Sequence, residues 1–311
     1  MPKPFRQARW DTLHPNLGAR VAACETTSLL CSPACTDPEL ACRTPNRMSA
    51  RDRDFSTISP SAKSLLMVKA QTSLPFARQA AELLCGASAV EEAARTMAST
   101  TWGIGRKHHF EQRARSIDAA IEGLGSASIL ELAAGLSFRG LDVAARRDDV
   151  FYLDTDLPEM VTIKTDLVRR LHPEPLRGTL LVKPLNALDA DAFRASVDLL
   201  PAGPIAVVQE GLFMYLDDAE KAALAAHVRA ALRACGGSWV TADVYVRSAF
   251  QPQRDERTAK FLEAHKVEEK KFGDFAAATA FFEGSGFAVA RRLSPAADPW
   301  PVRQTWVLEA R

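Results

Sequence analysis

The 311-residue chain has almost no net charge, no long apolar run and few cysteines, and each absence excludes a class of protein. Its 39 basic and 38 acidic residues leave a formal charge of +1, which gives no field for attracting nucleic acid or an anionic membrane. No apolar stretch approaches the roughly 18 residues that span a bilayer, and the opening MPKPFRQARW lacks the apolar centre of a signal peptide. We therefore expect a soluble, cytoplasmic protein that binds neither nucleic acid nor membrane.

Most of the cysteines lie near the start of the chain, at Cys24, Cys31, Cys35 and Cys42. They lack the paired close spacing of common zinc sites, so we expect no metal. Six prolines before residue 48 and the lack of apolar periodicity predict a disordered N-terminal extension over residues 1–47. Met48 opens MSARDRDFSTIS, which looks like an ordinary bacterial start, and we expect the extension to precede the native start.

Residues 48–311 divide into a helical cap and a core. Apolar residues at helical spacing from 59 to 123 predict the cap over 48–123. Five apolar runs alternate with helical segments and predict a parallel sheet: Ser128 to Leu132, Val150 to Asp154, Thr179 to Lys183, Ile205 to Glu210 and Ser238 to Val246. Two late runs, 287–293 and 304–309, favour a hairpin and an antiparallel last strand. The predicted fold is α/β, a doubly wound, mostly parallel seven-stranded Rossmann-like sheet over 124–311.

One stretch, SILELAAGLSFRGLDVAARRDDVFYLDTD, places a turn of small residues between two strands. Glu131 lies at the end of the first strand, and Ala133 and Gly135 follow without bulk, so a ligand can approach the backbone. Asp154 and Asp156 end the second strand roughly 20 residues after Gly135, where ribose hydroxyls would need an acceptor. This spacing predicts a nucleoside cofactor.

A nicotinamide dinucleotide fits this turn poorly. It favours G-x-G-x-x-G, and aligning Gly135 with the second glycine puts Phe138 at the third, where helix and strand must pack closely. No tyrosine has a lysine four residues later, so the dyad of short-chain reductases is absent. S-adenosylmethionine has no pyrophosphate. The common motif of proteins that bind it is an acidic residue followed by alternating glycines, and Glu131, Ala133, Gly135 and Ser137 match this pattern with small residues at two of the glycine positions. A nicotinamide-dependent oxidoreductase and a non-catalytic protein with a degenerate fold stay open as alternatives.

Three motifs resemble those of the leucine carboxyl methyltransferase-like class I methyltransferases, which include bacterial O-methyltransferases of polyketide type. The family's GAGLDTR turn corresponds to AAGLSFR at 133–139. Its second strand ends in an acid, any residue, Asp, a bulky residue and Pro, with a Lys six residues later, and here this is DTDLP at 154–158 with Lys164. Its EGxxMYL motif corresponds to EGLFMYL at 210–216. ISPSA at 58–62 and Arg113-x-Arg115-x-x-Asp118 are similar to its N-terminal elements. The resemblance covers about residues 58 to 245.

The resemblance implies S-adenosyl-L-methionine as the cofactor and a small-molecule methyl acceptor. It implies that Arg113 pairs with the cofactor carboxylate, that Lys63 makes a second carboxylate contact and that Asp154 accepts bonds from the ribose. Asn186 would face adenine N6. The remaining cofactor-binding residues that it implies are Glu131, Ala133, Gly135, Ala187, Glu210 and Tyr215.

The expected reaction is methyl transfer to a carboxylate or hydroxyl oxygen. A carboxylate is already ionised at neutral pH, whereas a phenol or an alcohol usually needs a base. The sequence shows no convincing base, because we interpret His108 and His109 as surface or cap histidines. This favours a carboxylate or an acidic hydroxyl, and no catalytic residue is assigned. The identity of the acceptor and the oligomeric state cannot be read from the sequence.

Overall fold

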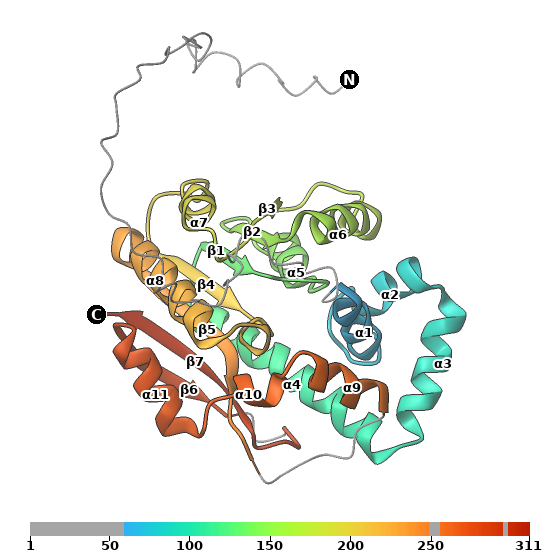
Figure 1. The fold of residues 1–311 in the computed structure, drawn as a ribbon. Coiled ribbons are helices and arrows are strands. Elements are labelled where there is room, and N and C mark those ends of the chain that lie inside the picture. Colours follow the sequence, from blue (N-terminus) through green and yellow to red (C-terminus); the bar gives the residue numbers. More distant parts are fainter. Residues whose placement is uncertain (1–58, 249–255, 295–297) are drawn as a thin grey trace, which may run out of the picture. The chain divides into compact units, whose positions relative to one another are not determined.

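The computed structural model describes residues 59–248, 256–294 and 298–311, so the predicted extension over 1–47 and Met48 lie outside the described residues. The described chain forms a seven-stranded sheet in the order β3-β2-β1-β4-β5-β7-β6 (Figure 1). Its strands are β1 (Ser128–Leu132), β2 (Phe151–Asp156), β3 (Thr179–Pro184), β4 (Ile205–Gln209), β5 (Gly237–Tyr245), β6 (Phe287–Leu293) and β7 (Arg303–Ala310).

Strand direction confirms the predicted topology. Strands β1 to β5 pair in parallel, and β7 lies antiparallel between β5 and β6. The chain runs outward from β1 through β2 to β3, then returns to place β4 on the other side of β1. In an open parallel sheet the carboxyl ends of strands at such a reversal border a crevice, and ligands bind there.

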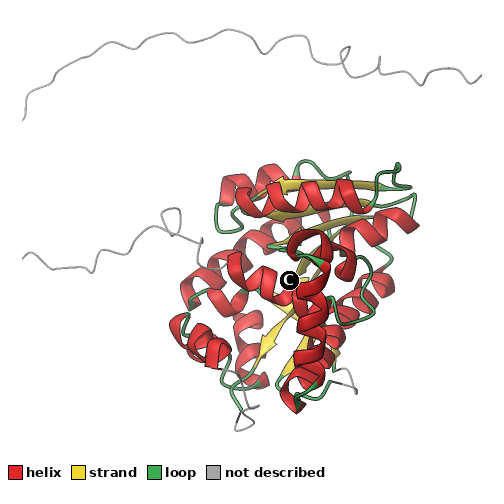
Figure 2. Cartoon of the chain, turned by 90° about the vertical axis from the view of Figure 1, so that its right-hand side faces the viewer, coloured by secondary structure: helices red, strands yellow, loops and turns green. Residues whose placement is uncertain are grey.

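Helices cover both faces of the sheet, as the predicted doubly wound fold requires (Figure 2). One face carries α4 (Thr101–Leu124), α5 (Arg139–Arg146) and α6 (Pro158–Leu171). The other carries α7 (Ala190–Val197), α8 (Asp218–Cys235) and α11 (Phe275–Gly284). Neighbouring strand residues point to opposite faces, so the fully buried strands are apolar on both sides.

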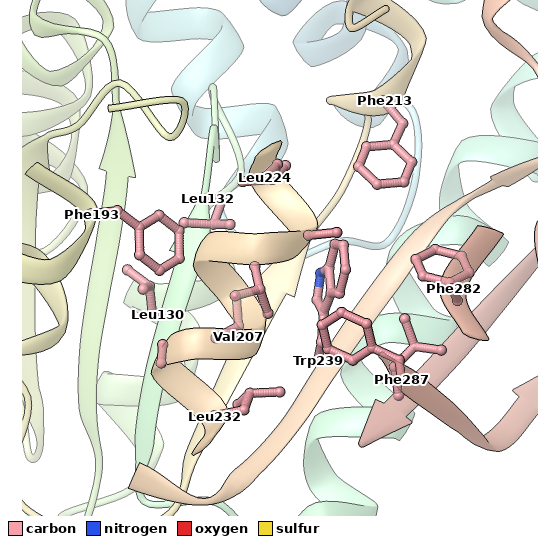
Figure 3. Close-up of a cluster of buried hydrophobic side chains, with 14 of the residues drawn as sticks. Leu130, Leu132, Phe193, Val207, Phe213, Leu224, Leu232, Trp239, Phe282 and Phe287 are labelled. Atoms are coloured by element: carbon pink, nitrogen blue, oxygen red, sulfur yellow. The ribbon is translucent and has the colours of Figure 1, made fainter. Parts of the chain in front are cut away.

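The larger core cluster lies on the face covered by α7, α8 and α11 (Figure 3). There Trp239 of β5 lies among aromatic rings, with Phe287 at 5.3 Å and Phe282 at 5.5 Å between ring centroids. Leu224 and Leu232 of α8 complete the packing beside β4 and β1. This burial of large rings fixes α8 and α11 against the strands whose carboxyl ends form the crevice.

Helix α8 begins at a capping box, whose pattern of Asp217 followed by Glu220 is readable in the sequence. The Asp217 carboxylate accepts a hydrogen bond from the Glu220 amide at 2.9 Å, and the Glu220 carboxylate accepts one from the Asp217 amide at 2.8 Å. Both bonds satisfy amides that have no partner within the helix, so the start of α8 is fixed by local sequence.

In the described residues before the sheet, the predicted helical cap consists of α1 (Ser59–Lys69), α2 (Ala77–Cys85), α3 (Ala87–Ala98) and α4. Helices α1, α2 and α3 share an apolar cluster with α5 and α6. Two further helices, α9 (Glu256–Ala264) and α10 (Val267–Lys270), follow β5 in a region where no motif predicts structure.

Gly237, at the start of β5, tests how closely the strands pack. Its φ is +105°, and a Cβ built there would lie 2.0 Å from the carbonyl oxygen of Ile205 on β4. We expect Gly237→Ala to lower the free energy of unfolding by about 3 kcal/mol, because both backbone strain and overpacking oppose it. Gly284→Ala, where a Cβ meets nothing within 4 Å, is the matched control.

Urea unfolding of the two variants measures the difference, and the control should stay within about 0.5 kcal/mol of the wild type or gain stability. Equal losses in both variants would contradict the close approach of β4 and β5.

Candidate functional site

A cavity of about 800 Å³ lies at the carboxyl edge of the sheet. Its lining comes from the segments that follow β1, β2, β3, β4 and β5, and from α1, α3, α4, α9 and α10 of the cover. The volume falls within the range of small-molecule pockets, about 300–1,000 Å³. The cavity therefore occupies the crevice that the strand order creates.

The turn after β1 forms one wall of this cavity. Ala133 and Gly135 have left-handed φ values of 48° and 53°. This conformation is common for glycine but unusual for a residue with a side chain such as Ala133. The Ala134 amide donates to the Thr155 carbonyl at 2.9 Å, and the Gly135 amide donates to Asp156 Oδ2 at 2.6 Å. The turn is therefore tied to the end of β2 by both backbone and side chain.

Asp156, rather than Asp154, is the carboxylate that lines the cavity. Asp156 Oδ1 also accepts a hydrogen bond from the Leu157 amide at 2.7 Å. Burial raises the pKa of Asp156 above its usual value, although both amide bonds act in the opposite direction. Each of its oxygens still has a lone pair for a ligand.

Asp154 is placed differently from its predicted role. It is 1% exposed, is absent from the cavity lining and forms an ion pair with buried Lys164. Burial raises its pKa to about 7 despite that partner. The predicted ribose contact was Asp154, whereas the carboxylate that lines the cavity is Asp156, two residues further on at the end of the strand.

Glu131 also lies beneath the cavity wall and does not line it. It is fully buried, and its carboxylate accepts hydrogen bonds from Arg139 Nη1 and, at 2.5 Å, from the Tyr152 hydroxyl. Its position supports the turn from below, so a direct cofactor contact of Glu131 is not what this geometry provides.

Glu210, directly after β4, is surrounded by three cations. Its Oε1 accepts from Lys69 Nζ at 2.9 Å and from Arg113 Nε at 3.0 Å, and its Oε2 accepts from Arg139 Nη2 at 2.8 Å. Burial alone would raise the pKa of Glu210, but the three cations hold it well below its usual range. Glu210 and Arg113 both line the cavity, as their predicted roles require.

The turn that carries Glu210 is fixed by a carboxylate on the neighbouring strand. Asp243 of β5 accepts hydrogen bonds from the backbone amides of Leu212 at 2.7 Å and Phe213 at 3.0 Å. A short 3-10 helix, η1 (Phe213–Tyr215), follows. Asp243 also accepts from the Gly211 amide, so it holds the EGLFMYL segment at the edge of the sheet through three backbone amides.

Lys63 is exposed and does not line the cavity, whereas Lys69, at the end of the same helix, is buried against Glu210. On α1 the lysine that lines the cavity is therefore Lys69, which sequence reasoning missed. Its signal was a lysine that ends an otherwise apolar segment, LLMVK, because such a position buries the stem and directs the charge inward.

Asn186, Ala187 and Tyr215, for which cofactor binding is a prediction, line the cavity. Asn186 Oδ1 accepts a hydrogen bond from the Leu188 amide at 3.1 Å, so its side chain also shapes the turn after β3. The Tyr215 hydroxyl donates to Ser61 Oγ at 3.1 Å and connects η1 with α1.

His109 is a buried member of the site, which differs from its interpretation as an ordinary cap or surface histidine. It is 2% exposed, and its ring nitrogens lie 2.9 Å from Asp298 Oδ1 and 2.9 Å from the Tyr245 hydroxyl. Burial lowers the pKa of His109 to about 4, although Asp298 acts to raise it. The helical pattern holds the only signal: His109 lies four residues before Arg113, so the two share a face of α4.

Among the described residues, no group of three or more His, Cys, Asp and Glu side chains is arranged to hold a metal ion. The N-terminal cysteines lie outside these residues. A membrane-spanning candidate is likewise missing from the helices of the described part, because none combines sufficient length with sufficient apolar character.

No family model matches the chain, and no curated protein matches its sequence. Solved structures do resemble it. A DUF574 family protein from Streptomyces avermitilis is 16% identical and matches 72% of this chain and 91% of its own, with a TM-score of 0.50. This likeness shows a shared fold.

Two structures with weaker similarity have names that state an activity. The mitomycin 7-O-methyltransferase is 12% identical over 80% of this chain and 67% of its own, with a TM-score of 0.46. An O-methyltransferase family protein from Burkholderia thailandensis is 18% identical over 73% of this chain, with a TM-score of 0.43, and this chain spans 62% of its length.

Arg139 is the first residue of α5 and contacts three carboxylates, those of Asp118, Glu131 and Glu210. We expect Arg139→Lys to lower the free energy of unfolding by about 3 kcal/mol, because one ammonium cannot span carboxylates that a planar guanidinium joins. Arg146→Lys is the matched control, because Arg146 ends the same helix, is 63% exposed and forms an ion pair with Asp142.

Urea unfolding provides the comparison, and Arg146→Lys should change the free energy by no more than about 0.5 kcal/mol. A loss below about 1 kcal/mol in Arg139→Lys would show that the buried cluster does not depend on the guanidinium.

The lowered pKa of His109 predicts a pH dependence of stability. Between its ordinary pKa of about 6.5 and the folded value of about 4, the unfolded chain binds the proton and the folded protein does not. Stability that is present above pH 6.5 is therefore lost as the pH falls towards 4. Between pH 7 and pH 5, His109 should contribute a loss of about 2 kcal/mol.

Urea unfolding at both pH values tests this in the wild type, His109→Gln and His108→Gln. His108 is exposed and adjacent, so its variant should retain the full wild-type loss, whereas His109→Gln should lose about 2 kcal/mol less. The same pH dependence in all three proteins would contradict a buried, neutral His109.

Proposed function

We propose that this protein is an S-adenosylmethionine-dependent O-methyltransferase that acts on a small molecule. Its strand order, with the last strand antiparallel between β5 and β6, supports this proposal, because class I methyltransferases have this arrangement. The motifs of the leucine carboxyl methyltransferase-like family support the finer assignment. In this proposal residues 48–123 form the cap and residues 124–311 the cofactor-binding core.

The observation that carries the choice of cofactor is the hydrogen bond from the Gly135 amide to Asp156 at 2.6 Å. A dinucleotide needs the amides of this turn for its pyrophosphate, at the start of the following helix. Here a carboxylate already accepts from that amide, and its negative charge would repel a phosphate. Phe138, 4% exposed, also fills the position of the third glycine. A nucleoside cofactor without phosphates fits the turn better.

The cationic group around Glu210 provides for the amino-acid part of such a cofactor. Arg113 lines the cavity and uses its Nε, Nη1 and Nη2 atoms in the described contacts, yet a guanidinium carries five N–H donors, so two remain for a carboxylate. Lys69 lies on the same oxygen of Glu210 and also lines the cavity. We assign the cofactor carboxylate to Arg113 and Lys69, with Glu210 and Tyr215 beside the methionine part.

The nucleoside part is assigned to the neighbouring strand ends. Asp156, two residues beyond the predicted Asp154, takes the ribose hydroxyls, and the turn at Ala133 and Gly135 gives the ligand access to the backbone. Asn186, followed by Ala187, faces the adenine, since its amide oxygen can accept a bond from an exocyclic amine. When bound, the cofactor supplies an electrophilic methyl group on a sulfonium.

The residues of the chain contribute to methyl transfer by aligning the acceptor with the methyl group and by excluding water from the site. Apolar side chains of α1, α3, α4 and α9 cover the cavity and would exclude water from a charged centre. The left-handed Ala133 shows that the turn forms without its usual first glycine. Alanine in place of the family's first glycine therefore still leaves a cavity of about 800 Å³, so this difference does not by itself indicate a non-catalytic protein.

Titration calorimetry of the full chain with S-adenosylhomocysteine tests the cofactor assignment. We expect binding to the wild type and about tenfold weaker binding to Asp156→Asn, because one hydrogen bond to a charged group is lost. Glu159→Gln is the matched control, since Glu159 is exposed in the first turn of α6 and does not line the cavity.

The absence of heat with folded wild-type protein would refute the proposal. A parallel titration with NADH, followed by its fluorescence, should show no binding, and saturable binding there would support the oxidoreductase alternative instead. Binding of S-adenosylhomocysteine without methyl transfer to any small acid or phenol would favour a protein that has kept the fold without catalysis.

A further inference from the structure

Three side chains from distant parts of the chain form a hydrogen-bonded row that ends at the cavity. His109 of α4 lies between Asp298, which precedes β7, and Tyr245, the last residue of β5, with 2.9 Å to each. Asp298 is further held by Arg303 Nη2 at 2.9 Å and by the Trp300 amide at 3.0 Å. The cavity lining includes both His109 and Tyr245.

Chemistry fixes the position of each proton in this row. Burial would raise the pKa of Asp298, but the hydrogen bond from His109 keeps it below the usual value, so the carboxylate is ionised and can only accept. His109 Nδ1 must therefore carry a hydrogen. With its pKa lowered to about 4 by burial, the ring is neutral, and Nε2 is left as an acceptor.

Tyr245 then has one available orientation. Burial raises the pKa of its hydroxyl, so it keeps its proton and donates it to His109 Nε2. Its oxygen accepts a hydrogen bond from Arg113 Nη1 at 3.2 Å. Every donor in the row thus points towards Asp298, and towards a ligand the Tyr245 oxygen offers only a lone pair.

A lone pair at this point discriminates between the two acceptor classes. A hydroxyl group has a hydrogen to donate to the Tyr245 oxygen, whereas an ionised carboxylate has none and would place two acceptors against each other. A site with a fixed polar partner rejects a ligand that cannot complete the bond far more strongly than an apolar pocket does.

The remaining wall indicates the shape of the acceptor. Trp102 and Trp300 stack at 4.8 Å with an interplanar angle of 11°, and Trp300 lies 4.5 Å from the His109 ring. Both tryptophans line the cavity beside Phe110. Flat aromatic surfaces near the Tyr245 oxygen fit an aromatic ring that carries a hydroxyl group.

We propose that Tyr245 accepts the hydroxyl proton of a phenolic methyl acceptor, with His109 and Asp298 as the positioning residues that make Tyr245 an acceptor. This inference rests on the proposed function, and of the two expected acceptors, a carboxylate or an acidic hydroxyl, it selects the hydroxyl.

The step balances within these groups. In the same step as methyl transfer, the O–H bond of the acceptor breaks and its proton passes to the Tyr245 oxygen, while the Tyr245 proton passes to His109 Nε2 beside the Asp298 carboxylate. The steps are concerted because a ring with a pKa of about 4 could not hold the proton against a free phenolate. The acceptor oxygen forms a bond to the methyl carbon, and the carbon–sulfur bond breaks with its electron pair left on sulfur. His109 afterwards returns the proton through Tyr245 to solvent, so the row is restored.

The test uses the full chain, methyl-labelled S-adenosylmethionine and matched acceptor pairs in which the same ring carries either a hydroxyl or a carboxylate: phenol and benzoate, naphthol and naphthoate, hydroxyanthraquinone and anthraquinone carboxylate. We expect labelled methyl ethers. Esters formed as fast as ethers, or no ether from any hydroxyl, would overturn the inference. Calorimetry with S-adenosylhomocysteine separates this failure from that of the proposed function, because cofactor binding would survive only the former.

Tyr245→Phe should lower kcat/KM for the best hydroxyl acceptor about 100-fold, the usual contribution of one proton-transfer group. Affinity for S-adenosylhomocysteine depends on Tyr245 only through its hydrogen bond with Arg113, so it should change by less than about tenfold. Asp298→Asn should reverse the tautomer of His109 and turn the Tyr245 hydrogen towards the cavity. The ratio of hydroxyl to carboxylate turnover should then fall about tenfold or more. A merely structural role of Asp298 would leave this ratio unchanged.

His108→Gln is the control and should keep wild-type turnover, since His108 is exposed and lies outside the row. Full activity in Tyr245→Phe, or an unchanged hydroxyl preference in Asp298→Asn, would overturn the inference.

Discussion

The guanidinium of Arg139 is the constraint on which the site depends. It joins Glu131 of β1 to Glu210 beyond β4, and these are the two strands between which the sheet reverses its order. A carboxylate buried by itself would be very costly, and Arg139 contacts both of these buried carboxylates. The contact therefore fixes the two strand ends that border the crevice, and it begins in the first residue of α5.

The same charge balance attaches the cover to the sheet. Lys69 of α1 and Arg113 of α4 both reach Glu210, so two cap helices are held to a carboxylate of the core. Arg113 also continues to Tyr245, which connects the proposed cofactor carboxylate site with the proposed acceptor site through one side chain. Cofactor and acceptor would then meet where these contacts converge. A substitution of Glu210 would therefore change both the cofactor site and the acceptor site.

Local patterns predicted much of the fold. Apolar runs gave strand positions within one or two residues, the capping box at Asp217 and Glu220 marked the start of α8, and the short connection before β7 indicated its antiparallel direction. The site was harder to predict, because a sequence does not show which of two nearby residues with the same charge faces the cavity. Asp154 and Asp156 share a face of β2, and only the position of Lys164 and α6 shows which one is covered. Lys63 and Lys69 differ in the same way, through the packing of α1.

The sequence by itself determined the order of strands and helices, the small turn at Ala133 and Gly135 and the acidic end of β2, because each depends on neighbours in the chain. Only the tertiary structure decided which side chains meet. Asp298, His109 and Tyr245 come from three elements far apart in sequence, and their polarity follows from burial and mutual hydrogen bonds, which no local pattern contains. A histidine pair in a helix is ordinary until packing buries one ring between a carboxylate and a phenol.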